Sequence, residues 1–326
     1  PNAARIHGSR DYFEIRQKEF TIEIIPILGI KKAKEALNIT DVSPLHSAWV
    51  NKKGKGLKDD IRLLKQFCKA AKVYGAESFI HGLSGYVCEI LVIYFGGFLS
   101  VVRNAAKWAG KIVLDPEKQW KGKNILMELN ASKIDSPLVV IDPVQADRNA
   151  SAALSREKFA VFVNACKSFL KSPSKKFFEL EKVDEGSLKK KAGKAELAVI
   201  EAQPYPGKRD VVGCQLKKVF ACFKDSLQRN DFPIKGCDFV LQKPALLYFI
   251  IEKKQVSPTV EIVGPPCSVG KHVENFKKAH KTTFIKNKRV YAIEPRKFKT
   301  PQKLLEQLKK EPLVKANVRS LSIKWL

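Results

Sequence analysis

The sequence lacks the features that mark a membrane protein, a secreted protein or a common nucleotide-loop protein. Its longest apolar run, Val87–Val102, is about 16 residues long and contains Glu89, whereas a membrane-spanning helix needs roughly 20 residues. Residues 1–20 are polar and charged, so we expect no secretory signal there. No Walker A sequence and no GxGxxG motif occurs. We therefore expect a cytoplasmic protein that has no membrane partner.

Cysteine and histidine are too few and too scattered to form an obvious metal site. The seven cysteines are an odd number and include no CxxC pair, which excludes paired zinc-finger spacing. Several of them fall in apolar helical patterns, where a free thiol behaves as a small hydrophobic group. The five histidines lie far apart in the chain. We expect reduced thiols and no structural disulfide.

Acidic residues are scarce relative to basic ones. The 326 residues include 60 Lys and Arg against 33 Asp and Glu, a formal net charge of +27. A surplus of this size on a folded chain favours a polyanionic partner, and nucleic acid above all. The alternatives are solubility alone or an acidic lipid surface. A length near 300 and 44% hydrophobic residues predict two or three domains with real cores.

Apolar periodicity predicts a series of helices and strands in the first part of the chain. Residues 20–26 alternate as a strand, with Phe20, Ile22 and Ile24 on one face and Thr21 and Glu23 on the other. An acid facing water on an edge strand is the plain alternative for Glu23. The further predictions are helices over 56–75, 84–108 with a break at Gly96-Gly97, and 155–169, a strand over 137–142 and a polar turn over 143–149.

The last third alternates strands and helices after a Lys-, Gly- and Glu-rich segment, residues 180–196, which we predict to be a linker or an exposed loop. The predicted strands are 197–203, 245–253, 259–263 and 289–293, and the predicted helices are 210–229, 271–280 and 301–310. From Lys271 onward there are 16 Lys and Arg against 4 Asp and Glu, interleaved with aromatic residues. Basic side chains around aromatic rings suit phosphate contact and base stacking, although the rings could equally be core.

One catalytic motif can be set aside. Residues 82–86 read GLSGY, in which Tyr86 stands where a G-x-S-x-G nucleophile elbow needs its second glycine. No strongly apolar strand precedes the segment, as that elbow would require. A serine hydrolase is therefore not favoured.

Several motifs point together to one family. Their order is the strand ending in IEIIP, then SPLHSAW (Ser43–Trp49), RLLKQF (Arg62–Phe67), VYGAESFIHGLSGYVCEIL (Val73–Leu91) and VVIDPVQADRNASAALS (Val139–Ser155). In this order and spacing the chain resembles the archaeal-type, class I CCA-adding enzymes, which are tRNA nucleotidyltransferases. The resemblance is good over residues 15–180 and weaker to the C-terminus, where GPP (Gly264–Pro266) and HVENF (His272–Phe276) resemble the family's tail.

The resemblance implies an α+β multidomain fold. It would comprise part of a polymerase-β-like nucleotidyltransferase head (residues 1–56), a helical neck and nucleotide-binding domain (57–180), and a basic α+β body and tail that bind RNA (181–326). The implied activity is template-independent addition of CCA to tRNA 3′ ends from CTP and ATP, with Mg²⁺ held by three head carboxylates. The third carboxylate falls on Glu23, where the family normally has Asp, so Glu23 is the expected catalytic and metal-binding residue.

The resemblance also implies nucleotide contacts. His46 matches a nucleotide-site histidine, Lys65 and Tyr74 match residues that touch the triphosphate, and Asp147 and Arg148 match a pair near the incoming base. A surface lysine, a packed tyrosine and a turn-stabilising aspartate are the alternatives for Lys65, Tyr74 and Asp147. Expected contacts with the acceptor and T arms of tRNA fall on Lys271, Lys277, Lys278, Lys286, Arg289 and Arg296.

The family's GSxxxGT-like loop and DxD pair are absent from the sequence. We therefore expect the chain to act with a small catalytic-head subunit that supplies both, in an assembly that could itself dimerise. A non-catalytic tRNA-binding protein derived from the same family is the alternative. A nucleotidyltransferase of the oligoadenylate or poly(A) type is a weaker one, because the IDPV and DRN motifs favour CCA addition.

Overall fold

The computed structural model describes residues 3–7, 10–18 and 20–326, and the chain divides into two compact units, Pro1–Glu181 and Lys182–Leu326. The predicted boundary at 180–181 lies one residue from this division. The predicted boundary at 56–57 falls inside the first unit and stays a prediction.

The first unit begins with a three-stranded antiparallel sheet of β1 (Ala3–Ile6), β2 (Tyr12–Gln17) and β3 (Phe20–Ile24). The predicted strand is confirmed as β3, an edge strand whose five residues are all exposed. The sheet is tied to the unit through Asp41, which lies in the 3-10 turn η2 (Ile39–Val42). Its carboxylate accepts two hydrogen bonds from Arg10, at 2.5 and 3.0 Å, and one from each backbone N–H of Leu28, Leu37 and Asn38.

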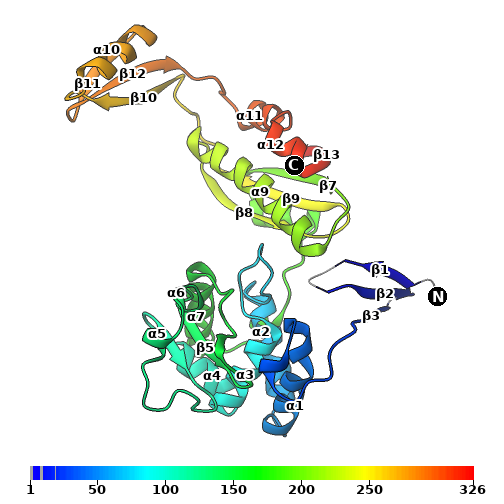
Figure 1. Ribbon diagram of the computed structural model, residues 1–326. Coiled ribbons are helices and arrows are strands. Elements are labelled where there is room, and N and C mark those ends of the chain that lie inside the picture. The colour runs from blue at the N-terminus through cyan, green and yellow to red at the C-terminus, as the bar shows by residue number, and fades with distance from the viewer. Residues whose placement is uncertain (1–2, 8–9, 19) are drawn as a thin grey trace. The chain divides into compact units, whose positions relative to one another are not determined.

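The rest of the first unit packs helices around a short sheet (Figure 1). Strand β5 (Leu138–Asp142) is entirely buried between β4 (Ile112–Leu114), to which it is parallel, and β6 (Gln145–Asn149). The helices are α1 (Ser43–Lys53), α2 (Lys58–Ala70), α3 (Gly85–Phe95), α4 (Phe98–Ala105), α5 (Ile125–Glu128), α6 (Ala131–Ile134) and α7 (Arg156–Lys171), with 3-10 turns η1 (Ala33–Glu35) and η3 (Lys175–Phe178).

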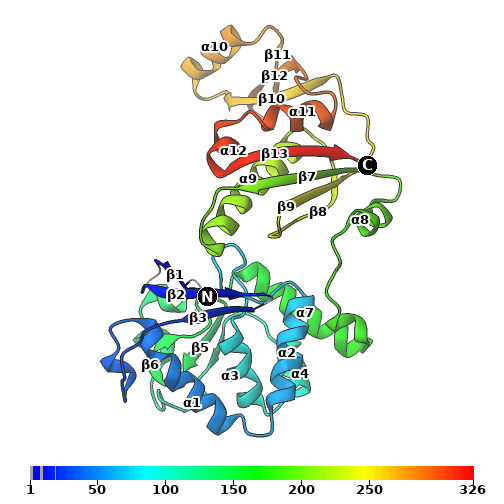
Figure 2. The ribbon, with the colours of Figure 1, turned by 90° about the vertical axis from the view of Figure 1, so that its right-hand side faces the viewer.

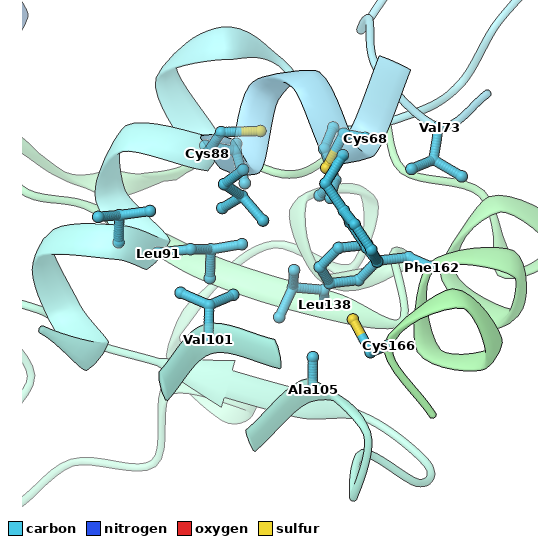
Figure 3. Close-up of a cluster of buried hydrophobic side chains, with 14 of the residues drawn as sticks. Cys68, Val73, Cys88, Leu91, Val101, Ala105, Leu138, Phe162 and Cys166 are labelled. Atoms are coloured by element: carbon cyan, nitrogen blue, oxygen red, sulfur yellow. The ribbon is translucent and has the colours of Figure 1, made fainter. Parts of the chain in front are cut away.

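Four of these helices and β5 enclose the core of the first unit (Figure 3). Cys68 from α2, Cys88 from α3 and Cys166 from α7 lie in it as free, buried thiols beside Phe162 and Leu138. The apolar stripe predicted for the helix over 56–75 is confirmed, because Ile61, Leu64 and Cys68 are all buried. Burial of an isoleucine or leucine side chain contributes roughly 1.5–3 kcal/mol.

The predicted break in the 84–108 helix is confirmed at Gly96-Gly97. Gly96 and Gly97 have φ of +78° and +137°, values that a residue with a Cβ adopts only with strain, and α3 and α4 meet there at 93°. Among the described residues no single helix is long and apolar enough to cross a membrane. In the part of the chain that the structure describes, the bent pair α3 and α4 meets that criterion together, and its residues contribute heavily to the core.

The second unit contains a four-stranded sheet in the order β13 (Val318–Trp325), β7 (Glu196–Pro204), β9 (Ala245–Ile251) and β8 (Ile234–Val240), all pairs antiparallel (Figure 2). Helices α9 (Arg209–Arg229), α11 (Pro301–Leu308) and α12 (Pro312–Asn317) bury one face, and α8 (Glu185–Ala192) packs on the other. A separate sheet of β10 (Thr259–Pro266), β12 (Arg289–Pro295) and β11 (Thr283–Lys286) carries α10 (Gly270–Ala279).

Two predicted segments were wrong in secondary structure. Residues 180–196 are not a linker or loop throughout, because α8 forms behind a capping box in which Asp184 and Ser187 satisfy each other's backbone N–H groups. Residues 143–149 are not simply a turn, because β6 pairs with β5 through Ile141 and Asn149. Strands β8 and β13 fall where no strand was predicted.

Candidate functional site

A buried carboxylate organises the end of strand β5. Asp142 is fully buried, and its two oxygens accept hydrogen bonds from Arg148 at 2.5 Å, Tyr86 at 3.2 Å and the backbone N–H of Val144 at 3.0 Å. His46 Nε2 lies 3.0 Å from Asp142 Oδ2. Four elements therefore meet at one carboxylate: α1, α3, β5 and β6.

The charge of Asp142 is stabilised by these neighbours. Burial raises the pKa of the carboxyl, but hydrogen bonds from His46 and Val144 and the charges of His46 and Arg148 outweigh it, so the pKa is lowered overall. Burial next to this carboxylate raises the pKa of Tyr86, which stays a neutral hydrogen-bond donor. An ionised Asp142 thus holds Arg148 and His46 in place on a partly exposed surface.

A second cluster lies at the N-terminus of α3. The Tyr74 hydroxyl comes so close to Gly85 that a Cβ there would lie 2.9 Å from it, and Lys65 Nζ would lie 3.7 Å away. Lys65 Nζ also pairs with Glu89 Oε1 at 2.6 Å. Burial raises the pKa of Tyr74, so its hydroxyl keeps its proton.

Local backbone geometry explains why this cluster forms. Residues 73–75 and 82–83 run alongside each other with three backbone hydrogen bonds between them, and Tyr74 and Leu83 form a parallel bridge. Gly82 must be glycine here, because a Cβ would lie 2.1 Å from the Val73 carbonyl oxygen. Ser84 then caps α3 by accepting the Val87 N–H at 3.1 Å, which leaves Ser84 with a structural function.

A pocket of about 410 Å³ opens between the start of α3 and β6. Its lining includes Ala76, Ser84, Lys133, Gln145, Arg148 and Asn149. A helix N-terminus offers free backbone N–H groups and a partial positive charge, and Lys65, Tyr74 and Arg148 add further donors around it. This arrangement suits a polyphosphate with an attached base.

The structure brings together some predicted nucleotide residues and separates others. His46 and Arg148 meet at Asp142, and Lys65 and Tyr74 meet at Gly85. Asp147 stands apart, because successive residues on a strand point to opposite faces. Its exposed carboxylate pairs with Lys133 at 3.0 Å. Asp142, Tyr86 and Glu89 were not predicted, although an Asp that ends the apolar run PLVVID was a usable signal.

Glu23 does not form a metal site with the described residues. It lies on exposed β3 opposite Glu14 of β2, and Glu14 is engaged by Arg16 at 2.7 Å. Among the described residues no group of three His, Cys, Asp or Glu side chains could hold a metal ion. One free carboxylate beside a paired one is too few for the two-metal chemistry expected of Glu23.

The tail sheet has one open face that is both basic and aromatic. Strand register places Phe284 opposite Tyr291 and Lys286 opposite Arg289, so these four side chains share a face. The two rings stack at 5.5 Å, and Lys286 Nζ lies 5.9 Å from the Tyr291 ring centre. Helix α10 covers the other face, where Phe276 and Val290 crowd Gly264, and it carries the exposed Lys271, Lys277 and Lys278.

Arg296 requires a correction. Its guanidinium is buried and donates to the carbonyls of Ser257 at 2.7 Å and Asn230 at 2.8 Å, and to the Asp231 carboxylate at 2.7 Å. All three of its nitrogens are therefore used inside the protein. The basic residue was predicted to contact RNA, but its position gives it a structural function.

Family models match most of the chain. Residues 59–179 match the model described as tRNA nucleotidyltransferase, second domain, and residues 192–320 match that described as CCA-adding enzyme, C-terminal domain.

Curated relatives point to the same family as the two family models. The chain is 32% identical over 293 residues to the CCA-adding enzyme of Nanoarchaeum equitans, covering 89% of this chain and 71% of the relative. It is 30% identical over 304 residues to that of Methanoregula boonei (90% and 64%), and 32% identical over 316 residues to that of Methanosarcina mazei (92% and 67%). The chain thus spans about two thirds of the length of these relatives, and it belongs to the CCA-adding enzyme family of tRNA nucleotidyltransferases.

Proposed function

We propose that this chain takes part in adding CCA to the 3′ end of tRNA from CTP and ATP. The observation that carries the proposal is the pocket at the start of α3, which is lined by Ser84 and Arg148, while Lys65 and Tyr74 lie at the neighbouring Gly85. Phosphoryl transfer depends mainly on positioning and on charge stabilisation, which these groups can provide for a nucleoside triphosphate.

The roles follow from the contacts. Lys65, with its orientation fixed by Glu89, and the Tyr74 hydroxyl would donate to phosphate oxygens near the N-terminus of α3. Arg148, held by Asp142, would present its remaining N–H groups to the incoming base, and His46 would line the same site. Asp147 would act from the opposite side of β6.

CCA-adding nucleotidyltransferases generally use Mg²⁺. Because the described residues do not complete a metal site, we propose that Glu23 acts together with carboxylates from outside these 326 residues, on a small partner chain. The apolar face of the N-terminal sheet supports this, since Phe13, Phe20, Ile22 and Ile24 are 43–74% exposed there. Apolar surface of this kind is normally covered.

The tail sheet would bind tRNA through its backbone. Five of the exposed basic residues of the tail are the predicted RNA contacts Lys271, Lys277, Lys278, Lys286 and Arg289. Lys286 and Arg289 lie beside the stacked rings of Phe284 and Tyr291, whereas the three lysines of α10 lie on the helix that covers the other face. Lysine or arginine contacts to phosphate supply affinity without reading sequence. Arg296 is not part of this surface.

A nucleotide-addition assay tests the proposal. The substrate is tRNA lacking CCA, with CTP, ATP and Mg²⁺, and the chain is assayed alone and with a head fragment that carries a GSxxxGT loop and a DxD strand. Addition of two CMP and one AMP only in the mixture is the expected result. Full activity of the chain alone would overturn the partner chain, and growth beyond CCA would indicate an enzyme of the poly(A) type.

A non-catalytic tRNA-binding protein is the second candidate. The single observation in its favour is that Glu23 stands without a second and third free carboxylate among the described residues. This candidate predicts tight tRNA binding but no measurable CTP binding, either by the wild type or by Lys65→Ala, because no nucleotide would occupy the α3 pocket.

A further inference from the structure

One lysine joins the short helix α6 to strand β6 on both sides of Arg148. The Lys133 ammonium donates to the Asp147 carbonyl oxygen and, at 3.0 Å, to Asp147 Oδ2. The Lys133 backbone carbonyl accepts a hydrogen bond from Asn149 Nδ2 at 2.8 Å. Asp147 and Asn149 are the chain neighbours of Arg148, so Lys133 holds the strand on either side of the residue that we place at the incoming base.

The contact with Asn149 gives Lys133 a fixed starting point. Asn149 is 4% exposed, and its Oδ1 accepts hydrogen bonds from the N–H groups of Val140 and Ser151 and from the Ser151 hydroxyl, at 2.9–3.0 Å. A buried amide whose oxygen and nitrogen are both bonded specifies one local arrangement. The backbone of α6 is therefore held against β5 and β6, and the Lys133 side chain reaches Asp147 from there.

The contact with Asp147 depends on charge. The hydrogen bond from Lys133 is the main reason that the pKa of Asp147 is lowered, so the carboxylate is ionised at neutral pH. The two side chains are 39% and 66% exposed, and a pair of this kind contributes little to stability. The ammonium also binds the Asp147 carbonyl, and β6 is the outer strand of its sheet. Loss of Lys133 should therefore free the β6 backbone without unfolding the unit.

The direction of Arg148 depends on that backbone. The structure holds its guanidinium at Nη1, which donates to Asp142 Oδ2 at 2.5 Å, and the side chain is 31% exposed. Lys133 and Arg148 both line the pocket at the start of α3. The N–H groups that Arg148 turns toward a base can bind cytosine N3 or adenine N1, which accept hydrogen bonds. Uracil N3 and guanine N1 carry hydrogen and are donors, so a correctly aimed arginine rejects them.

We propose that Lys133 is a positioning residue for Arg148, and that through the β6 backbone it sets the preference for cytosine and adenine over uracil and guanine. Lys133 acts through its contacts with Asp147 and Asn149, and not as a ligand of the nucleotide. The inference rests on the proposed function, because a preference among bases requires a site for an incoming nucleotide.

The first test needs no nucleotide. In the full chain labelled with ¹⁵N, the Nε–H signal of Arg148 is identified by its loss in Arg148→Lys. Lys133→Met keeps the side-chain stem but removes the charge, and we expect it to shift this signal and to speed its hydrogen exchange about threefold or more. Urea titration should show that the variant is folded.

Lys111→Met is the matched control for this test. The Lys111 ammonium donates to the carbonyl of Ile134, the last residue of α6, so the variant removes a similar contact from the same helix. Its Arg148 signal should match that of the wild type. An unchanged Arg148 signal in Lys133→Met, or the same change in Lys111→Met, would overturn the proposal.

The second test measures nucleotide preference. Calorimetric titrations of the full chain with CTP and with UTP give the ratio of the two dissociation constants. Lys133→Met should lower the preference for CTP about fivefold, because the Arg148 donors are no longer aimed at cytosine N3. Lys133→Arg, which keeps a cationic donor, should restore most of the preference. Equal weakening of CTP and UTP in Lys133→Met would mean that only general charge was lost, and it would overturn the assigned role.

These outcomes are separable from failure of the proposed function. A wild-type chain that binds no nucleotide would contradict CCA addition, and the Arg148 signal would still decide whether Lys133 positions that residue. Normal CCA addition by Lys133→Met with a head fragment, without insertion of U, would reject the role of Lys133 in base preference and leave CCA addition intact.

Discussion

His46 and Asp142 lie 96 positions apart in the chain and meet at 3.0 Å in the first unit. The contact joins α1, which follows the N-terminal sheet, to the buried end of β5. Arg148 binds the same Asp142 oxygen at 2.5 Å. One carboxylate thus sets the positions of two residues that were predicted to contact nucleotide.

Replacing this carboxylate should affect both stability and nucleotide binding. Asp142→Asn leaves Arg148 and His46 without their charged partner, and we expect a loss of about 2–4 kcal/mol in the free energy of unfolding. CTP affinity should fall with it, because Arg148 loses its fixed orientation. The control is Asp147→Asn, whose exposed pair with Lys133 should contribute less than about 1 kcal/mol. Equal effects in urea titrations of the two variants would contradict the structural role of Asp142.

Acid should abolish the contribution of the Asp142 carboxylate to the free energy of unfolding. The pKa of Asp142 is lowered below its usual 3.8, so the unfolded chain takes up a proton there before the folded chain does. The stabilisation is complete above pH 3.8 and is lost as the pH falls through the folded pKa. The stability difference between the wild type and Asp142→Asn should therefore shrink as the pH falls below 4. A difference that grows between pH 4 and pH 2 would contradict this sign.

Asp41 should determine whether the N-terminal sheet stays attached. Burial raises the pKa of Asp41, but hydrogen bonds from Leu28, Arg10 and Asn38 lower it to about 2. Asp41→Asn should release residues 3–24 to protease at pH 7, and the wild-type chain should show the same release as the pH falls from about 4 toward 2. Asp11→Asn, which removes an exposed pair with Arg5, should leave cleavage unchanged.

The cluster at Gly85 should carry phosphate affinity. Lys65→Ala should weaken CTP binding about tenfold, which corresponds to roughly 1.4 kcal/mol, because a charged donor to a phosphate is lost. Tyr74→Phe should weaken it less. Lys58→Ala, on the same helix but away from Gly85, is the matched control. Calorimetric titration with CTP measures all three, and an equal loss in Lys58→Ala would mean that general charge, not the cluster, binds the nucleotide.

Features of the fold that depend on local sequence patterns could be predicted, whereas contacts between elements far apart in the chain could not. The α2 stripe and the glycine break between α3 and α4 follow from local periodicity and φ preference, and both were predicted. The meeting of His46 with Asp142 could not be derived from local pattern, because it depends on packing between elements far apart in the chain. Strand β13 escaped prediction for the same reason, since its partner β7 lies more than 100 residues earlier. Arg296 shows the limit of charge counting, because a basic residue in a basic tail proved to be buried.

Arg289 and Arg296 should therefore behave differently although both lie in the tail. Arg289 is exposed beside Lys286 and Tyr291, so Arg289→Ala should weaken tRNA binding to all sequences alike and lower the salt slope by slightly less than one, with little effect on stability. Arg296→Ala removes three hydrogen bonds from a buried site and should lower the free energy of unfolding by about 2–4 kcal/mol. At temperatures where that variant is folded, its tRNA affinity should equal that of the wild type. Reduced affinity with unchanged stability would restore Arg296 to the RNA-binding surface, because only direct contact with phosphate could then account for the loss.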